Sequence, residues 1–405
     1  MTRDRSEIRP VLKTLVVFGT RPEAIKLAPV VAELRARAGT QVIVCVTGQH
    51  REMLDQVLGL FGVAPDHDLD VMKADQRPED VSAEILRATA ELARSLRPDA
   101  VLVQGDTTTA MAGSLGAFFA RVPVGHVEAG LRTGIRTSPF PEEMMRRIVS
   151  EIAYFHFAPT TRAAANLARE HADTEGLVYL TGNTVVDAVQ WIGRKSEPTK
   201  LPFERRAKRL VLVTAHRREN FGEPIRNICR AVRTLVERHG DLEIAYPVHL
   251  NPNVREDVYA LLSNHDRIHL LRPVTYAELV RLLRDADLVL TDSGGIQEEA
   301  PVFGKPVLVL RRDTERPEAV EAGIALLVGT DTLAIVDAAT RLLTDPAAYE
   351  RMAQARSPFG DGRAAKRIAD ILISWRQGEL DRVEYLRWRE GAELVPYRML
   401  ETATR

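Results

Sequence analysis

The sequence is poor in cysteine and has neither a charge excess nor a long apolar run. Cys45 and Cys229 are its only cysteines in 405 residues, which excludes a disulfide scaffold or a cysteine-based zinc site and suits a reducing cytosol. Lys+Arg number 55 and Asp+Glu number 56, so the formal net charge is -1. This balance leaves no basic footprint for a nucleic acid or an anionic membrane, and an anionic ligand would need a local basic site.

Targeting signals and cofactor motifs are also missing. No apolar run approaches the ~18 residues of a membrane span, and the polar start MTRDRSEIRP lacks the apolar region of a signal peptide. We therefore expect a soluble, cytoplasmic protein that binds no membrane. The chain has no G-x-G-x-x-G fingerprint, no Walker motif and no H-E-x-x-H pattern, so no metal and no cofactor is predicted.

Short apolar runs alternate with helical patterns along nearly the whole chain. Examples are LVVFGT before a helix with Pro22 near its start, AVLVQGD before TTTAMAGSLGAFF, and DLVLTDSGG before IQEEA. Such alternation with short connections predicts parallel sheets that are covered by helices on both faces. The length favours two or three domains at roughly 150 residues each.

A charged segment with two prolines, RKSEPTKLPFERRAKR, interrupts this pattern before it starts again. We predict an α/β fold with two doubly wound, Rossmann-like domains, at residues 1–193 and 210–360, joined by a connection at 194–209. Residues 361–405 are expected to form C-terminal helices. Beyond residue 376 they form an extension whose purpose the sequence does not disclose.

Unusual polar residues fall at the strand ends of the first half, where doubly wound sheets bind their ligands. Arg21 and Lys26 flank a helix N-terminus that favours an anion. Asp106 follows AVLVQG, and Glu142 enters a helix after SPFP; both also fit an ordinary helix cap or acidic first turn. Glu128 lies between small residues at a strand end and has no evident structural task.

The second half places groups suited to phosphate at its strand ends. Ser293-Gly294-Gly295 precedes a helix and could cradle a phosphate with its backbone, although a Gly-Gly turn alone is a weak signal. Acids in the first half and phosphate donors in the second together predict a nucleotide-sugar in an interdomain cleft. Its sugar would face the three first-half carboxylates, and its diphosphate would face the Ser-Gly-Gly turn.

A set of motifs occurs along the chain in the same order as in a known family. FGTRPEAIKLAPV, TGQHREMLDQVL, VQGDTTT, VGHVEAGLRT, SPFPEE, TDSGGIQEEAP and ERPEAVEAG resemble the bacterial, non-hydrolysing UDP-N-acetylglucosamine 2-epimerase family, and the match runs from about residue 13 to about residue 375. The resemblance implies a GT-B-like fold, two Rossmann-like domains around a central cleft with C-terminal helices returning to the first. It also implies a homodimer.

The resemblance further implies an activity and a set of roles. UDP-N-acetylglucosamine (UDP-GlcNAc) would be epimerised reversibly at C2 to UDP-N-acetylmannosamine (UDP-ManNAc), supplying sugars for cell-surface polysaccharide. The family's catalytic positions match Asp106, Glu128, Glu142 and His216. Its substrate-binding positions match Arg21, Lys26, Val274, Leu279, Ser293, Gly294, Gly295, Glu299 and Arg316. Bacterial members use a second UDP-GlcNAc molecule as an activator, at positions that match Gln49, His50, Glu52, Arg217 and His249.

The chemistry can be argued from what is absent. A C2 hydrogen beside an acetamido group is not acidic, and there is no nicotinamide site to oxidise a neighbouring hydroxyl. The remaining route eliminates UDP from C1, passes through 2-acetamidoglucal, reprotonates C2 on the opposite face and returns UDP to C1. This route needs acid/base groups on both faces of C2, and the sequence does not assign a carboxylate to either face.

Two positions depart from the family pattern. Met145 stands where the family commonly has Asn, and Leu279 stands where an aromatic residue often lies, which would weaken base stacking. Other interpretations stay open at this point. They are an epimerase of a related UDP-2-acetamido sugar (a uronate or a diacetamido sugar), a hydrolysing epimerase, a GT-B glycosyltransferase, and a non-catalytic nucleotide-sugar sensor.

Overall fold

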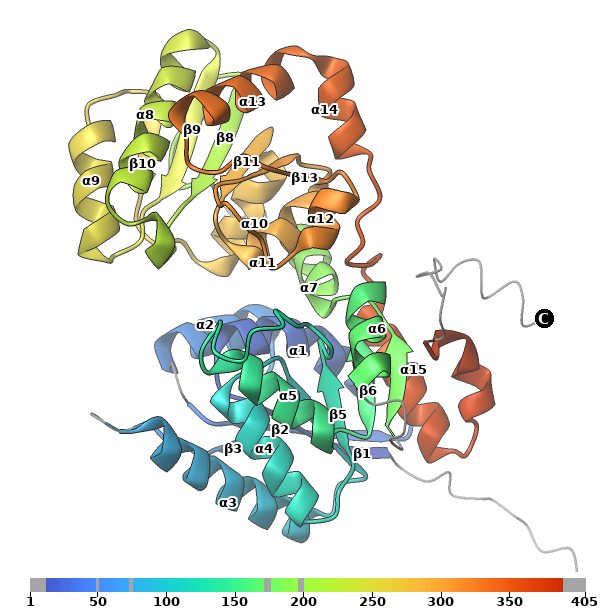
Figure 1. Ribbon diagram of the computed structural model, residues 1–405. Helices are drawn as coiled ribbons and strands as arrows, with labels where there is room; N and C mark the ends of the chain where they lie inside the picture. The colour runs from blue at the N-terminus through green and yellow to red at the C-terminus, as the bar shows by residue number, and fades with distance from the viewer. Residues whose placement is uncertain (1–11, 49–50, 73–75, 171–175, 196–199, 389–405) are drawn as a thin grey trace, which may run out of the picture. The chain divides into compact units, whose positions relative to one another are not determined.

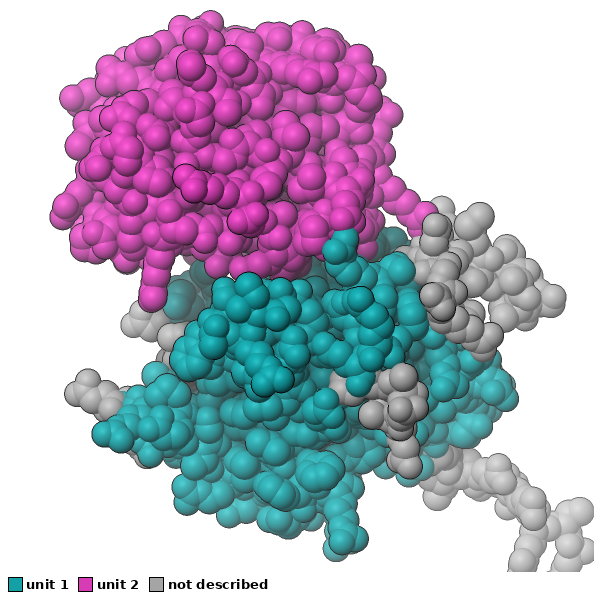
Figure 2. All heavy atoms as spheres, viewed as in Figure 1, with its two compact units in different colours: residues 1–188, 359–405 teal, residues 189–358 magenta. Residues whose placement is uncertain are grey.

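The computed structural model describes residues 12–48, 51–72, 76–170, 176–195 and 200–388, apart from the side chains of Arg51, Glu52 and Tyr385. It divides the chain into two compact units (Figures 1 and 2). Unit 1 comprises Met1–Ala188 together with Phe359–Arg405, and unit 2 comprises Val189–Pro358.

Unit 1 is built on a seven-stranded sheet with the order β3-β2-β1-β4-β5-β6-β7. Every pairing in it is parallel. Strands β2 and β3 follow on one side of β1 and strands β4 to β7 on the other, and such sheets bind ligands at this switch point between β1 and β4. Its strands are β1 (Leu12–Phe18), β2 (Thr40–Val46), β3 (His67–Asp68), β4 (Ala100–Gln104), β5 (Val124–Val127), β6 (Phe155–Ala158) and β7 (Leu177–Leu180). The intervening helices are α1 (Arg21–Arg35), α2 (Arg51–Phe61), α3 (Pro78–Leu96), α4 (Thr108–Phe119), α5 (Glu142–Ile152), α6 (Thr161–Glu170) and α7 (Thr184–Gly193).

Unit 2 repeats the same plan with a six-stranded sheet, in the order β10-β9-β8-β11-β12-β13. Its pairings are also parallel. The strands are β8 (Arg209–Thr214), β9 (Leu242–Pro247), β10 (Ile268–Leu271), β11 (Leu288–Thr291), β12 (Val307–Val309) and β13 (Ala325–Leu327). The helices are η1 (Arg218–Asn220), α8 (Glu223–Arg238), α9 (Pro252–Leu262), α10 (Tyr276–Asp285), α11 (Gly294–Glu299), η2 (Ala300–Phe303), α12 (Pro317–Glu321), α13 (Thr332–Thr344) and α14 (Pro346–Ala353). The predicted α/β fold with two doubly wound parallel sheets is confirmed.

The strands are apolar because both faces of each sheet are covered. All five residues of β4 and all four of β11 are buried. Val211, Leu235 and Leu288 belong to the core of unit 2, while Leu15 and Val101 belong to the core of unit 1.

The chain returns to unit 1 after residue 358 through α15 (Ala364–Arg376) and η3 (Leu380–Leu386). Arg37 Nη2 contacts Asp370 at 3.0 Å, and the Trp375 ring lies edge-on to Phe155 at 5.2 Å between ring centroids. The Trp388 backbone N–H then donates to the Val178 carbonyl at 2.8 Å. The extension past residue 376 therefore covers the edge strand β7. An exposed edge strand can pair with strands of other molecules.

The described part of the predicted connection belongs to unit 2. The Arg206 backbone N–H donates to both oxygens of buried Glu243, at 3.1 and 3.2 Å, and the Phe203 ring stacks on His269 at 4.0 Å. Among the described residues no helix is long and apolar enough to cross a membrane. In the same part of the chain, no cluster of three His, Cys, Asp or Glu residues could hold a metal ion.

Candidate active site

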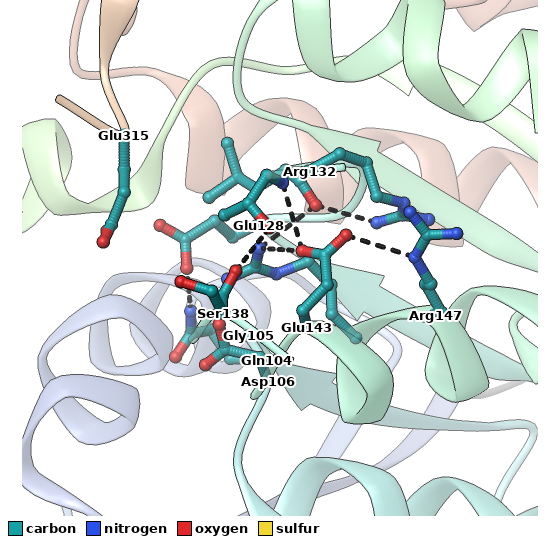
Figure 3. Close-up of polar contacts among 12 residues, drawn as sticks. Gln104, Gly105, Asp106, Glu128, Arg132, Ser138, Glu143, Arg147 and Glu315 are labelled. Atoms are coloured by element: carbon teal, nitrogen blue, oxygen red, sulfur yellow. Dashed lines mark hydrogen bonds and ion pairs between the residues drawn. The ribbon is translucent and has the colours of Figure 1, made fainter. Parts of the chain in front are cut away.

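Polar side chains gather at the carboxyl ends of β1, β4 and β5 in unit 1. The sheet order makes β4 a neighbour of both other strands, so residues that follow these strands meet at one edge. Asp106 comes two residues after β4, Glu128 comes directly after β5, and Glu142 is the first residue of α5. Figure 3 shows Gln104, Asp106 and Glu128 in one close-up.

Glu128 is held in an unusual backbone conformation by several donors. Its φ is 65°, in the left-handed region that non-glycine residues seldom adopt, and its side chain is 7% exposed. Lys26 Nζ binds Oε1, Gln104 Nε2 donates to Oε2 (Figure 3), and Asn183 Nδ2 donates to Oε1 at 3.3 Å. One cation and two amides thus stabilise a carboxylate at the switch point of the sheet. Lys26, which the resemblance places at the substrate, contacts Glu128.

Asp106 is held by α5 instead. Arg146 Nη2 binds Asp106 Oδ2, while Arg146 Nη1 donates to the Leu131 carbonyl at 3.2 Å and to Glu143 Oε2 at 3.3 Å. Glu143 is fully buried and also accepts from the Thr133 backbone N–H at 3.1 Å. The ion pairs of buried Glu143 and Arg146 with half-buried Asp106 therefore fix the start of α5 against the turn after β4.

Glu142 differs from the other two acids. Its Oε2 atom is buried and has no hydrogen-bond partner among the described residues. Met145, on the same helix, places its sulfur 4.0 Å from Thr108 Oγ1 at the start of α4. Met145 thus places a thioether where the family that the sequence resembles commonly has the amide of Asn.

Two buried titratable groups shape the turns beneath the acids. Burial lowers the pKa of His126 to about 4, against the opposing effect of its Nε2 contact with the Gly105 carbonyl at 2.8 Å. His126 is therefore neutral near pH 7, and it supports the turn that leads to Asp106. Burial raises the pKa of Glu23, which accepts from the Thr20 backbone N–H at 2.7 Å and from Thr107 Oγ1 at 2.6 Å.

In unit 2, the buried carboxylate of Asp292 organises the loop that carries His216. Asp292 Oδ2 accepts from the backbone N–H groups of His216 and Arg217, both at 2.8 Å, and from Asn220 Nδ2 at 3.0 Å. The loop after β8 is thereby fixed to the residue that precedes Ser293. The side chain of His216, the second residue after β8, is 38% exposed.

The Ser293–Gly295 turn at the start of α11 lies beside charged side chains, and Glu315 Oε2 would lie 3.9 Å from a Cβ at Gly294. A Cβ at Gly294 would lie 3.8 Å from Arg217 Nη2, an ordinary contact, so the guanidinium borders this turn. Arg316 Nε binds the Glu298 carboxylate at the next helical turn, and Arg316 Nη1 donates to the Glu315 carbonyl at 3.1 Å. Buried Glu299 ends α11, while Val274 and Leu279 are half-buried at the start of α10.

Of the predicted activator positions, the structure describes Arg217 and His249. The His249 ring stacks on His216 with centroids 5.3 Å apart and an interplanar angle of 16°, so a predicted activator residue contacts a predicted catalytic one. Gln49 and His50 lie outside the described residues, as does the side chain of Glu52.

Sequence reasoning missed the residues that hold the acids. Gln104 lies inside the motif VQGDTTT, Arg146 follows SPFPEE by three residues, and Asn183 lies in the segment TGN. Asp292, which holds the loop of His216, lies inside TDSGGIQEEAP. The motifs marked these segments as unusual. Only the pairing of segments far apart in sequence shows which carboxylate each donor serves, and no one-dimensional pattern carries that pairing.

Comparison with known proteins completes the description. A family model described as UDP-N-acetylglucosamine 2-epimerase matches residues 32–373. The UDP-N-acetylglucosamine 2-epimerase of Escherichia coli (strain K12) is 49% identical over 370 residues, covering 89% of this chain and 98% of the relative.

Solved structures are similar as well. The UDP-GlcNAc 2-epimerase from Neisseria meningitidis, bound to UDP-GlcNAc, matches with a TM-score of 0.79 and 45% identity, covering 89% of this chain and 100% of that one. The glycotransferase of kitacinnamycin matches with a TM-score of 0.64 at 16% identity, covering 91% and 99% of the two chains, which shows a likeness of fold alone.

Proposed function

The chain belongs to the UDP-N-acetylglucosamine 2-epimerase family, and from this premise we propose that it interconverts UDP-GlcNAc and UDP-ManNAc by inverting C2. The observation that carries the proposal is the set of three carboxylates at one edge of the unit 1 sheet, each in a different environment. Glu128 faces a cation and two amides, Asp106 faces Arg146, and Glu142 has a buried oxygen without a described partner.

We propose the elimination route for this inversion. A carboxylate removes the C2 proton while the C1–O bond to UDP breaks, and the electron pair of the C2–H bond becomes the C1–C2 double bond of 2-acetamidoglucal. A second carboxyl group then protonates C2 from the opposite face, and UDP adds back to C1. Positioned acid/base groups contribute typically 10²–10⁴-fold each to such proton transfers.

The leaving UDP carries negative charge that must be stabilised. Unit 2 provides His216, Arg217 and the backbone N–H groups at the start of α11, grouped by the hydrogen bonds of Asp292. Donors that are already oriented lower the cost of developing charge because they need no reorganisation during the reaction. We assign the diphosphate to these groups, with His216 as the side chain that stabilises or protonates it. Glu299 would accept from ribose hydroxyls.

We also propose activation by a second UDP-GlcNAc molecule, at a site that includes Arg217 and His249. The ring stack between His249 and His216 supports this proposal because it gives the activator a direct contact with a group on the diphosphate. Velocity against UDP-GlcNAc would then be sigmoidal, with a coupling of typically 1–3 kcal/mol between the sites. The product would feed cell-surface polysaccharide, and the active form would be a homodimer, as the family resemblance implies.

The test is a time course of proton NMR spectra of the purified protein with UDP-GlcNAc and no acceptor sugar. We expect the anomeric signal of UDP-ManNAc to appear and both UDP-sugars to reach equilibrium. Release of free ManNAc and UDP would indicate a hydrolysing epimerase, and no turnover without an acceptor would indicate a glycosyltransferase. Inertness toward UDP-GlcNAc, with turnover of its uronate or diacetamido analogue, would overturn the choice of sugar.

A further inference from the structure

Glu128 is tied to a distant part of the chain through Asn183, which lies in the turn between β7 and α7. The buried Asn183 side chain donates from Nδ2 to Glu128 Oε1 at 3.3 Å, and its backbone N–H donates to the Phe359 carbonyl at 2.7 Å. Phe359 is the residue at which the chain re-enters unit 1, directly after Pro358. One buried residue therefore contacts both a proposed acid/base group and the crossing point of the chain.

The backbone on both sides of this link is packed without spare room. Gly182 has a φ of 89° and Gly360 a φ of 116°, and both lie in the left-handed region. A Cβ at Gly360 would lie 3.2 Å from Gly182 Cα and 3.5 Å from the Asn183 backbone nitrogen. The turn before α7 and the crossing segment thus touch backbone to backbone, so a shift of one displaces the other.

The residues after the crossing are fixed to unit 1 by a buried cation. Arg367 has no exposed surface; its Nη1 donates to the Thr181 carbonyl at 2.9 Å and to Asp361 Oδ1 at 2.8 Å, and its Nη2 donates to Asp361 Oδ2 at 2.9 Å. The carbonyl of Thr181 lies just before Gly182. This clamp makes the junction a stiff part of unit 1 instead of a loose linker.

We propose that Asn183 is a positioning residue for Glu128, and that the crossing segment at Phe359–Gly360 sets the place of Asn183. The proposal rests on the proposed epimerase function, in which Glu128 exchanges a proton at C2. The path of the chain between the two units would then adjust an acid/base group through a single amide.

The effect of the amide is electrostatic as well as geometric. An N–H group that donates to a carboxylate favours its ionised form. Lys26 on α1 forms an ion pair with Glu128. Asp106 lies in the same close-up (Figure 3) and is paired with Arg146, while His126, on the strand that precedes Glu128, is neutral near pH 7. Removing the amide, or replacing it by a carboxylate, should therefore change the titration of Glu128 as well as its place.

The first test compares Asn183→Ala with Asn183→Asp. Asn183 Oδ1 accepts from the Val185 backbone N–H at 3.0 Å, and Asp retains this acceptor while it repels Glu128. We expect Asn183→Asp to lower kcat roughly 10- to 10²-fold, as a misplaced catalytic group does, and to lose some stability because it buries a second carboxylate beside Glu128. The acid limb of its kcat/KM profile should move to higher pH. Asn183→Ala should lose both stability and kcat.

The second test disturbs the crossing segment without touching Glu128. Gly360→Ala would place a methyl group against Gly182 and Asn183, whereas Gly378→Ala carries a similar left-handed φ of 73° but meets nothing within 4 Å. We expect both variants to lose some stability and only Gly360→Ala to lose kcat, with a smaller change in KM.

The outcomes distinguish failure of the proposed function from failure of the positioning role of Asn183. If the wild-type protein does not epimerise UDP-GlcNAc, the proposed function fails before any variant is compared. If the wild type turns over and Asn183→Asp keeps both its kcat and its pH profile, Asn183 is only a turn residue and the positioning role is wrong. Equal kcat in the Gly360→Ala and Gly378→Ala variants would overturn the coupling to the crossing segment.

Discussion

Units 1 and 2 share one strand order but hold their buried carboxylates in opposite ways. Glu128 in unit 1 is held by side chains that come from α1, β4 and the turn after β7. Asp292 in unit 2 is held chiefly by the backbone N–H groups of His216 and Arg217. The comparison teaches that the same fold can hold a strand-end acid either by side chains from several elements or by the backbone of the loop that the acid shapes.

A third carboxylate shows that the difference does not follow the unit boundary. Asp187 lies on α7 in unit 1, yet it accepts from the backbone N–H groups of Ala364 and Ala365 at 3.2 and 2.9 Å, at the start of α15. Backbone partners therefore mark structural acids in either unit. Glu128 and Asp106, which we assign to chemistry, are held by side chains instead.

The largest expected effect is on the unit 1 acids. Glu128→Gln, Asp106→Asn and Glu142→Gln should each lower turnover roughly 10²-fold or more with little change in stability, because each removes a proton-transfer group from a strand end or helix start. Steady-state kinetics and thermal melts check this. Exposed Glu151, on the same helix as Glu142, supplies the control variant Glu151→Gln, which should behave as wild type. Near wild-type turnover would remove a residue from the catalytic set.

A smaller effect on turnover is expected for Asp292 in unit 2, which shapes the loop after β8. Asp292→Ala leaves two buried backbone donors and Asn220 without their acceptor, which should cost about 1–3 kcal/mol of unfolding free energy for each group left unsatisfied. Turnover should fall as well, because His216 loses its orientation. Urea denaturation measures the loss. Stability equal to that of Glu128→Gln would show that the two carboxylates are not held differently.

Asp187, which is held by backbone N–H groups, gives a pH-dependent test of how such a buried carboxyl group affects stability. Burial raises the pKa of Asp187 to about 7, against the opposing backbone hydrogen bonds of Ala365 and Ala364. The folded state then binds a proton that the unfolded chain has lost, so the contribution of Asp187 to stability falls as the pH rises from about 4 to about 7. Asp187→Asn keeps an acceptor and should remove this slope.

Melting temperatures at pH 5 and pH 8 measure the slope. Relative to wild type, Asp187→Asn should be more stable at pH 8 than at pH 5, by a few degrees. Identical slopes in the two proteins would mean that Asp187 is ionised in the fold at both pH values.

The smallest effect concerns base binding in unit 2. Leu279→Phe restores the aromatic residue of the family pattern, and an aromatic contact adds about 0.5–1.5 kcal/mol. We expect KM to fall about 2- to 12-fold with kcat unchanged, because the base lies away from C2. Steady-state kinetics measure both constants. A change confined to kcat would show that residue 279 does not contact the base.

The order and type of the elements could be predicted from sequence because the signals are local. LVVF and AVLVQ are apolar over the length of a strand, and Pro22 marks a helix start. The cap of α4 is Thr107, however, and not Asp106, which the sequence also allowed as a cap. The parallel sheets follow from that alternation. The short edge strand at His67–Asp68 carries no such signal, since two polar residues form it by pairing with β2.

The site could be predicted only in part. Asp106, Glu128 and Glu142 stood out as acids at strand ends, and their roles stay predictions. Their partners did not stand out, because Gln104 and Asn183 are separated from Glu128 by 24 and 55 residues. The positive φ of Glu128 is likewise set by tertiary contacts and by no feature of its neighbours in sequence.

The central claim, that unit 1 removes and replaces the C2 proton, is tested most directly by isotope exchange. Purified protein is incubated with UDP-GlcNAc in deuterated water, and UDP-ManNAc is isolated early for proton NMR and mass spectrometry. The account predicts deuterium at C2 in nearly every product molecule, because the carboxylate that protonates C2 draws on solvent. Product that retains the original C2 proton would contradict it.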